Sequence, residues 1–140
     1  MKSGNGITPA TTHLLDTSAV IAYLAQEPGA ERVQAIKTSA ALPFIALAEL
    51  SAVLWQKHGQ ALAEDTVQQV LAWHLPLLFP DQRSTLLAGY LNGRYRLGLG
   101  NSFVAALATT YHLTLVTKDT DFLAIPDLKL LLLGRAQSKV

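Results

Sequence analysis

Four acidic residues stand where they could act together. Asp16, Glu49 and the pair Asp119 and Asp121 each follow a short apolar segment closely. An unpaired, ionised carboxylate is costly to bury in such surroundings. Carboxylates held close together also repel one another, which raises their pKa values, and a hard divalent cation relieves that repulsion. Oxygen ligands suit Mg²⁺ or Mn²⁺, so the pattern is compatible with a site for one or two such ions.

Each acid also has a simpler structural explanation. Asp16 precedes Thr17 and Ser18, so it could cap a helix. Glu49 could lie on the exposed side of a helix, and Asp119 and Asp121 could stabilise a turn. Spacing alone leaves both explanations open for each acid.

The elements that must position the acids alternate between strands and helices. Helical periodicity and capping residues predict helices over 19–25, 28–38, 46–58, 61–74, from Asp81 to about Leu91, and over 102–111. Short apolar runs predict strands over 13–15, 42–45, 76–79, 113–117 and 128–133. This alternation is typical of an α/β domain with a mostly parallel sheet. In such sheets ligands bind beyond the carboxyl ends of the strands, which is where the acids fall.

The segments around the acids resemble the motifs of the PIN domain family. They read LLDTSAVIAYL over 14–24, ALAEL over 46–50 and VTKDTDF over 116–122. The likeness extends over nearly the whole chain from His13, and in size and motifs it is most similar to the VapC-like toxins of bacterial toxin–antitoxin pairs. It implies a three-layer α/β/α domain over residues 13–134. Residues 1–12 then form a flexible leader or an expression remnant, and residues 135–140 a tail.

The resemblance implies a metal-dependent endoribonuclease that leaves a 5′-phosphate and a 3′-hydroxyl. An ion bound by the acids would activate a water molecule and neutralise phosphate charge. The hydroxyls of Thr17 and Thr117 would orient ligands or water, although either could simply cap a turn. The implied catalytic residues are Asp16, Glu49, Asn101 and Asp119, and the implied ligands of Mg²⁺ or Mn²⁺ are Asp16, Glu49, Asp119 and Asp121.

Asn101 departs from the family pattern. The stretch LGLGNSFVAA over 97–106 matches a family segment in which an aspartate stands at this position. An amide keeps the shape and one acceptor oxygen but lacks the charge, so we expect weaker metal binding and reduced or abolished activity. A natural change and an engineered one are both compatible with the sequence, as is a plain helix-capping role. The alternative function is a catalytically silent PIN domain that binds RNA or protein.

Partners follow from the same resemblance. Arg94, Arg96 and Lys118 could contact RNA phosphates, although each could equally be an ordinary solvated charge. A toxin needs a cognate antitoxin, and the apolar segments Ala19–Leu24 and Leu47–Trp55 could form part of its groove. The same segments could serve a homodimer, which we also expect, or could complete the core of one copy.

Composition excludes several classes of protein. The 140 residues are 50% hydrophobic and 15% charged with a net charge of +1, which disfavours disorder and a strongly basic, nonspecific nucleic-acid binder. No cysteine is present, which excludes disulfides and thiolate metal sites. No apolar run approaches the roughly 20 residues of a membrane span, and we expect a cytoplasmic protein. No P-loop motif occurs, and Lys118 is poorly placed for a receiver-like phosphotransfer domain.

Overall fold

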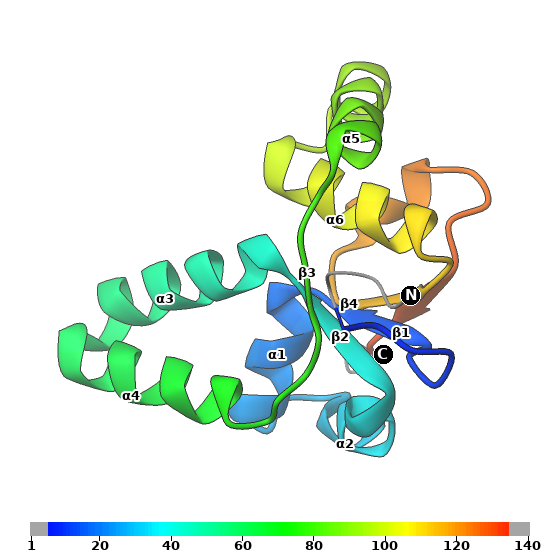
Figure 1. The fold of residues 1–140 in the computed structure, drawn as a ribbon. Helices are drawn as coiled ribbons and strands as arrows, with labels where there is room; N and C mark the ends of the chain where they lie inside the picture. The colour runs from blue at the N-terminus through cyan, green and yellow to red at the C-terminus, as the bar shows by residue number, and fades with distance from the viewer. Residues whose placement is uncertain (1–5, 135–140) are drawn as a thin grey trace.

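Strands and helices alternate along the chain, as the sequence predicts (Figure 1). The computed structural model describes residues 6–134, so the first five residues of the expected leader and the whole expected tail lie outside the described residues. The strands are β1 (His13–Leu15), β2 (Ala40–Pro43), β3 (Leu77–Leu78), β4 (Thr114–Thr117) and β5 (Leu130–Leu132). The helices are α1 (Thr17–Leu24), α2 (Ala30–Ile36), α3 (Phe44–His58), α4 (Gln60–Leu71), α5 (Gln82–Tyr95) and α6 (Leu99–Thr110), with 3₁₀ turns η1 (Lys37–Ser39) and η2 (Thr120–Ala124).

The five strands form one sheet in the order β3-β2-β1-β4-β5, and every neighbouring pair is parallel. The first three strands extend the sheet in one direction, and the chain then crosses to the other side of β1 to add β4 and β5. The boundary between β1 and β4, where Leu14 pairs with Leu115, is therefore a topological switch point. Parallel sheets bind ligands in the crevice beyond the strand ends at such a point.

Alternating side chains on the strands build two apolar cores, one on each face of the sheet. On β1, Leu14 joins the core formed with α5 and α6, whereas Leu15 joins the core formed with α1, α2 and parts of α3 and α4. On β4, Leu115 and Val116 divide in the same way. The result is the three-layer α/β/α architecture expected from the sequence, with the hairpin of α3 and α4 projecting to one side (Figure 1).

Several element boundaries differ from the predictions. The strand expected over 42–45 covers 40–43, because Pro43 is the N-cap residue of α3 and Phe44 already lies in that helix. The helix expected from residue 28 begins at Ala30, after Gly29 takes a φ of +99°. The helix expected to reach residue 74 ends at Leu71, and His74 has a φ of +56°.

The described part of the expected leader contacts the domain. Residues 8–11 form a turn in which the amide of Thr11 donates to the carbonyl of Thr8, and Ile7 packs against the core beneath α5 and α6. Across residues 6–134, none of the helices combines the length and apolar character required to span a lipid bilayer.

Candidate active site

A pocket of about 440 Å³ lies beyond the carboxyl ends of β1, β2 and β4. Asp16, Glu49, Asn101 and Asp119 all line it, so the four implied catalytic residues are brought together. Asp16 follows β1 directly, Glu49 lies in α3 after β2, Asn101 lies in α6, and Asp119 follows β4. Ile21, Ala52, Val53 and Val104 supply an apolar part of the wall.

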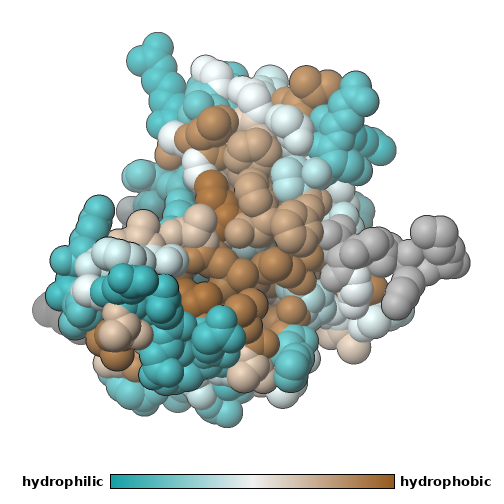
Figure 2. Space-filling view, turned by 60° about the vertical axis from the view of Figure 1, so that its left-hand side comes forward, coloured by the Kyte–Doolittle hydropathy of each residue, from teal (hydrophilic) through white to brown (hydrophobic). Residues whose placement is uncertain are grey.

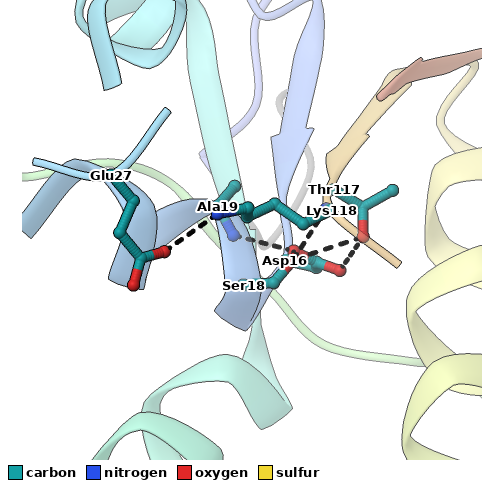
Figure 3. Close-up of polar contacts among 6 residues, drawn as sticks. All are labelled: Asp16, Ser18, Ala19, Glu27, Thr117 and Lys118. Atoms are coloured by element: carbon teal, nitrogen blue, oxygen red, sulfur yellow. Dashed lines mark hydrogen bonds and ion pairs between the residues drawn. The ribbon is translucent and has the colours of Figure 1, made fainter. Parts of the chain in front are cut away.

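Asp16 is the most enclosed of the acids, with 6% of its surface exposed. Its Oδ1 accepts hydrogen bonds from the Ser18 hydroxyl at 2.6 Å and from the backbone amide of Ala19 at 3.0 Å, and its Oδ2 accepts from the Thr117 hydroxyl (Figure 3). The bond to Ala19 makes Asp16 the N-cap of α1. The capping interpretation and the site interpretation therefore both describe this residue.

The environment of Asp16 acts on its charge in opposite directions. Burial is the largest influence and raises the pKa of the carboxyl, because the charged form loses water. Hydrogen bonds from Ser18, Thr117 and the amide of Ala19 lower the pKa, and the nearby charge of Asp119 raises it again. The net direction is upward, so this site holds its central carboxylate at a cost in free energy.

Glu49 is fixed by a residue from another helix. The Thr17 hydroxyl, in the first turn of α1, donates to Glu49 Oε1 at 2.6 Å. Among residues 6–134, no hydrogen bond is made to the other oxygen, Oε2. The exposed-helix interpretation of Glu49 is therefore wrong, since the side chain is half-buried and faces the pocket.

Asn101 and Asp119 are bonded to each other. The amide Nδ2 of Asn101 donates to Asp119 Oδ2 at 3.0 Å, while Asp119 Oδ1 accepts from the backbone amide of Asp121 at 2.9 Å. The prediction that α6 begins at Ser102 is wrong, because Gly98 is the N-cap and Asn101 lies within the first turn. The capping interpretation of Asn101 is wrong for the same reason.

Asp121 occupies a different place from the other acids. It lies in η2, is exposed, and is absent from the lining of the pocket. Its backbone amide helps to orient Asp119, so the turn interpretation describes what the structure shows for this pair.

The three cations implied for RNA binding lie outside the pocket lining. Lys118 Nζ forms an ion pair with Glu27 Oε1 at 3.0 Å, which directs its charge toward the end of α1 (Figure 3). Arg94 and Arg96 are exposed at the end of α5, and the guanidinium of Arg94 lies 5.4 Å from the ring centre of Tyr95.

The donor set of the pocket suits a hard cation. Three carboxylates and one amide oxygen are the ligand types that Mg²⁺ and Mn²⁺ accept. As arranged, no three acidic or histidine side chains within the described chain stand close enough together to enclose a metal ion. Mg²⁺ commonly keeps several waters and takes only one or two protein carboxylates, so these residues fit a hydrated ion.

Sequence reasoning missed three residues of the site. Ser18 was predicted only to start a helix, yet it bonds Asp16 and accepts the Lys118 backbone amide at 2.9 Å. Glu27 gave no signal, because its partner lies 91 residues away. Gly100 was expected to lie before the helix over 102–111, whereas it lies within α6 and next to Glu49 of α3. The available signal for Gly100 was a glycine at a position that a helix could include.

Solved structures of toxin–antitoxin complexes share this fold. A chain of DNA-bound VapBC from Salmonella typhimurium matches with a TM-score of 0.74 and 18% identity, covering 88% of this chain and 98% of that one. VapBC2 from Rickettsia felis, bound to a DNA fragment from its promoter, matches at 0.70 and 19%, covering 86% and 97%. A toxin–antitoxin complex from Klebsiella pneumoniae matches at 0.67 and 22%, covering 86% and 96%.

The sequence identifies the family of the chain. No curated protein matches the chain in sequence. The family described as PIN domain matches residues 13–128, a span that contains all four residues of the pocket. With this match over most of its length, the chain belongs to the PIN domain family.

Proposed function

We propose that this protein is a Mg²⁺- or Mn²⁺-dependent endoribonuclease and the toxin of a type II toxin–antitoxin pair acting in the cytoplasm. The observation that carries the proposal is the meeting of three carboxylates in one pocket at the switch point of the sheet: Asp16 after β1, Asp119 after β4, and Glu49 from α3. A hard cation at such a site polarises a water molecule and neutralises charge on a phosphodiester.

The side chains of the chain have distinct parts in this mechanism. Asp16, Glu49 and Asp119 would hold the ion, directly or through water. Thr17 holds the Glu49 carboxylate, and the hydroxyls of Ser18 and Thr117 hold that of Asp16. These bonds fix the carboxylates of Asp16 and Glu49 within the pocket, so little rearrangement is needed on binding.

Asn101 supports a second candidate, a silent PIN domain that binds RNA or protein. Its amide donates to Asp119 Oδ2 and so satisfies an oxygen that would otherwise be available to an ion. An aspartate at this position would instead present a fourth carboxylate and a stronger demand for a cation.

Cleavage of a labelled RNA pool with Mn²⁺ separates the two candidates. We expect the Asn101→Asp variant to cleave at least tenfold faster than the parent, because it adds a fourth carboxylate to the pocket. EDTA and the matched Asn101→Asp/Asp16→Asn double variant should abolish cleavage. If the folded Asn101→Asp protein binds Mn²⁺ and leaves RNA intact, the nuclease proposal is wrong and the binding module is favoured.

RNA contacts are proposed at three cations outside the pocket lining. We expect Arg94 and Arg96 to bind backbone phosphates, because both are exposed and neither is ion-paired within the described chain. Lys118 would contribute only after leaving Glu27. Replacing either arginine with alanine should weaken RNA binding. The slope of the logarithm of the binding constant against the logarithm of the salt concentration should fall by about 1.

Proposed protein partners include an antitoxin and a second copy of this chain. An apolar groove of about 350 Å³ between α1, α3 and α4 is lined by side chains that include Ile21, Leu24, Val53, Leu54 and Leu62. Figure 2 shows apolar surface extending across the middle of one face of the molecule. An amphipathic antitoxin helix fits the groove, and a Val53→Asp substitution should release it in co-purification. Sedimentation equilibrium tests the homodimer.

A further inference from the structure

Gly100 lies in the first turn of α6 at a position where the backbone itself does not require glycine. Its φ is not positive, unlike that of Gly98 just before the helix. Alanine is favoured over glycine in a helix, so the surroundings of this position decide whether a side chain fits. A Cβ added at Gly100 would lie 2.7 Å from Glu49 Oε2 and 3.6 Å from Ile45 Cδ1. The first distance is too short for any real contact, so a methyl group would displace the Glu49 carboxylate.

Glu49 is held at its other oxygen by Thr17. The hydroxyl donates to Oε1 at 2.6 Å from the first turn of α1. Glu49 itself lies in α3, so three helices meet at one carboxylate. A free glutamate side chain has several rotatable bonds and loses considerable freedom when it is fixed. Here the hydrogen bond from Thr17 fixes the position of the Glu49 carboxylate, and the absence of a Cβ at Gly100 leaves room for it.

We propose that Gly100 and Thr17 are positioning residues that together place the Glu49 carboxylate in the pocket. Gly100 supplies space and Thr17 supplies the hydrogen bond, so the effect of either residue depends on the other. The catalytic consequence rests on the nuclease proposed above. The dependence between the two residues does not, because it concerns only the side chain of Glu49.

A thermal unfolding cycle in EDTA tests that dependence without metal or activity. We expect Thr17→Val to lower the midpoint of the parent by a few degrees, since Glu49 Oε1 loses its donor. In the Gly100→Ala background the same change should cost less than half as much, because Glu49 has already moved. An equal loss in both backgrounds would overturn the proposal.

Glycines in α5 provide matched controls. A Cβ at Gly89 or Gly93 would meet nothing within 4 Å, so alanine there should leave the cost of Thr17→Val unchanged. Gly89→Ala and Gly93→Ala should unfold at or above the midpoint of the parent, because each gains helix propensity. In Gly100→Ala the loss of the Thr17–Glu49 bond should offset that gain, so its midpoint should stay near that of the parent. A large loss in Gly100→Ala alone would point to a structural role of the glycine and contradict the proposal.

Metal titration then tests the functional consequence in the Asn101→Asp background. We expect Gly100→Ala to weaken Mn²⁺ binding, followed by calorimetry, about three- to tenfold. In the Glu49→Asp background the shorter side chain avoids the added methyl, so Gly100→Ala should have no effect. Equal weakening in both backgrounds would contradict positioning through Glu49. If no variant binds Mn²⁺, the nuclease proposal fails and the unfolding cycle still decides the coupling.

Discussion

Asp16 shows how a single residue can oppose stability in the service of a site. Its burial raises the pKa of the carboxyl above the ordinary value of 3.8. The folded protein therefore favours the protonated form more than the unfolded chain does. The stability associated with this residue is therefore complete below pH 3.8 and is lost as the pH rises through the raised pKa. Proteins commonly accept such costs where activity needs them.

We predict that Asp16→Asn stabilises the metal-free protein at pH 7 by about 1 kcal/mol, because an amide has no charge to desolvate. The gain should vanish near pH 3, where the carboxyl is protonated in the folded and unfolded states alike. Urea unfolding in EDTA at the two pH values measures this difference. A variant less stable than the parent at pH 7 would mean that the hydrogen bonds from Ser18 and Thr117 outweigh the burial of the charge.

The residues of the site were predictable to different extents. Asp16, Glu49 and Asp119 could be identified because each follows an apolar strand in a recognisable motif. Thr17 and Thr117 were expected to orient ligands or water, and their hydroxyls donate to Glu49 and Asp16 in this structure. The hydrogen bond from Asn101 to Asp119 could not be predicted, since it depends on how α6 is rotated against the turn after β4.

At the scale of elements, the start of α5 is the clearest success of sequence reasoning, although the helix continues to Tyr95, beyond the expected end near Leu91. Asp81 was predicted to cap this helix, and its Oδ1 accepts the Ser84 amide at 2.8 Å while the Ser84 hydroxyl accepts the Asp81 amide at 2.9 Å. This reciprocal pair is a capping box. The start of α6 was missed, because Gly98 and Gly100 together are typical of a loop. The contact with Glu49 that gives Gly100 a place inside the helix is visible only in the structure.

The cap of α5 should make the protein sensitive to acid in the direction opposite to Asp16. The Ser84 backbone amide, followed by its hydroxyl, lowers the pKa of Asp81 below 3.8. Its stabilisation is present above pH 3.8 and is lost as the pH falls through the lowered pKa.

Asn caps helices about as well as Asp, so Asp81→Asn should leave the unfolding midpoint at pH 7 almost unchanged. The same variant should lose less stability than the parent between pH 4 and pH 2. Circular dichroism melts over this range provide the measurement. Parallel curves for the two proteins would mean that the carboxylate charge does not contribute to the cap.

On the scale of the whole molecule, Gly29 packs against Leu133, a residue near the end of the described chain. Gly29, before α2, has a φ of +99°, and a Cβ there would lie 2.9 Å from the Cβ of Leu133. The amide of Leu133 in turn donates to the carbonyl of Thr117 at 2.8 Å, beside the pocket. The turn between α1 and α2 is thus packed against the end of the sheet that carries Asp119.

We predict that Gly29→Ala lowers the free energy of unfolding by about 2–4 kcal/mol, since it adds backbone strain to overpacking. Hydrogen exchange at the Leu133 amide should also accelerate, because the strand end must move away. Gly59→Ala is the control: its φ is +86°, but a Cβ there meets no atom within 4 Å. It should destabilise without accelerating exchange at Leu133. Slow exchange at Leu133 in Gly29→Ala would show that the turn moves instead.

The overall architecture followed from alternation, whereas the order of the strands did not. Five strands and six helices were expected, with a mostly parallel sheet, and all five strands are parallel. Nothing in the short runs of leucine and alanine specifies that β1 lies between β2 and β4. That order depends on two cores filling together, which is a property of long-range packing.

The hydroxyls around Asp16 have one further consequence, which follows from counting hydrogens. Ser18 and Thr117 have one hydroxyl hydrogen each, and both hydroxyls donate to the side chain of Asp16. Their oxygens accept from the backbone amides of Lys118 and Asp119. A peptide N–H can only donate, so the direction of this chain of bonds is set by the backbone. Neither hydroxyl therefore has a hydrogen left to protonate a departing oxygen, so in the proposed hydrolysis that proton comes from another group.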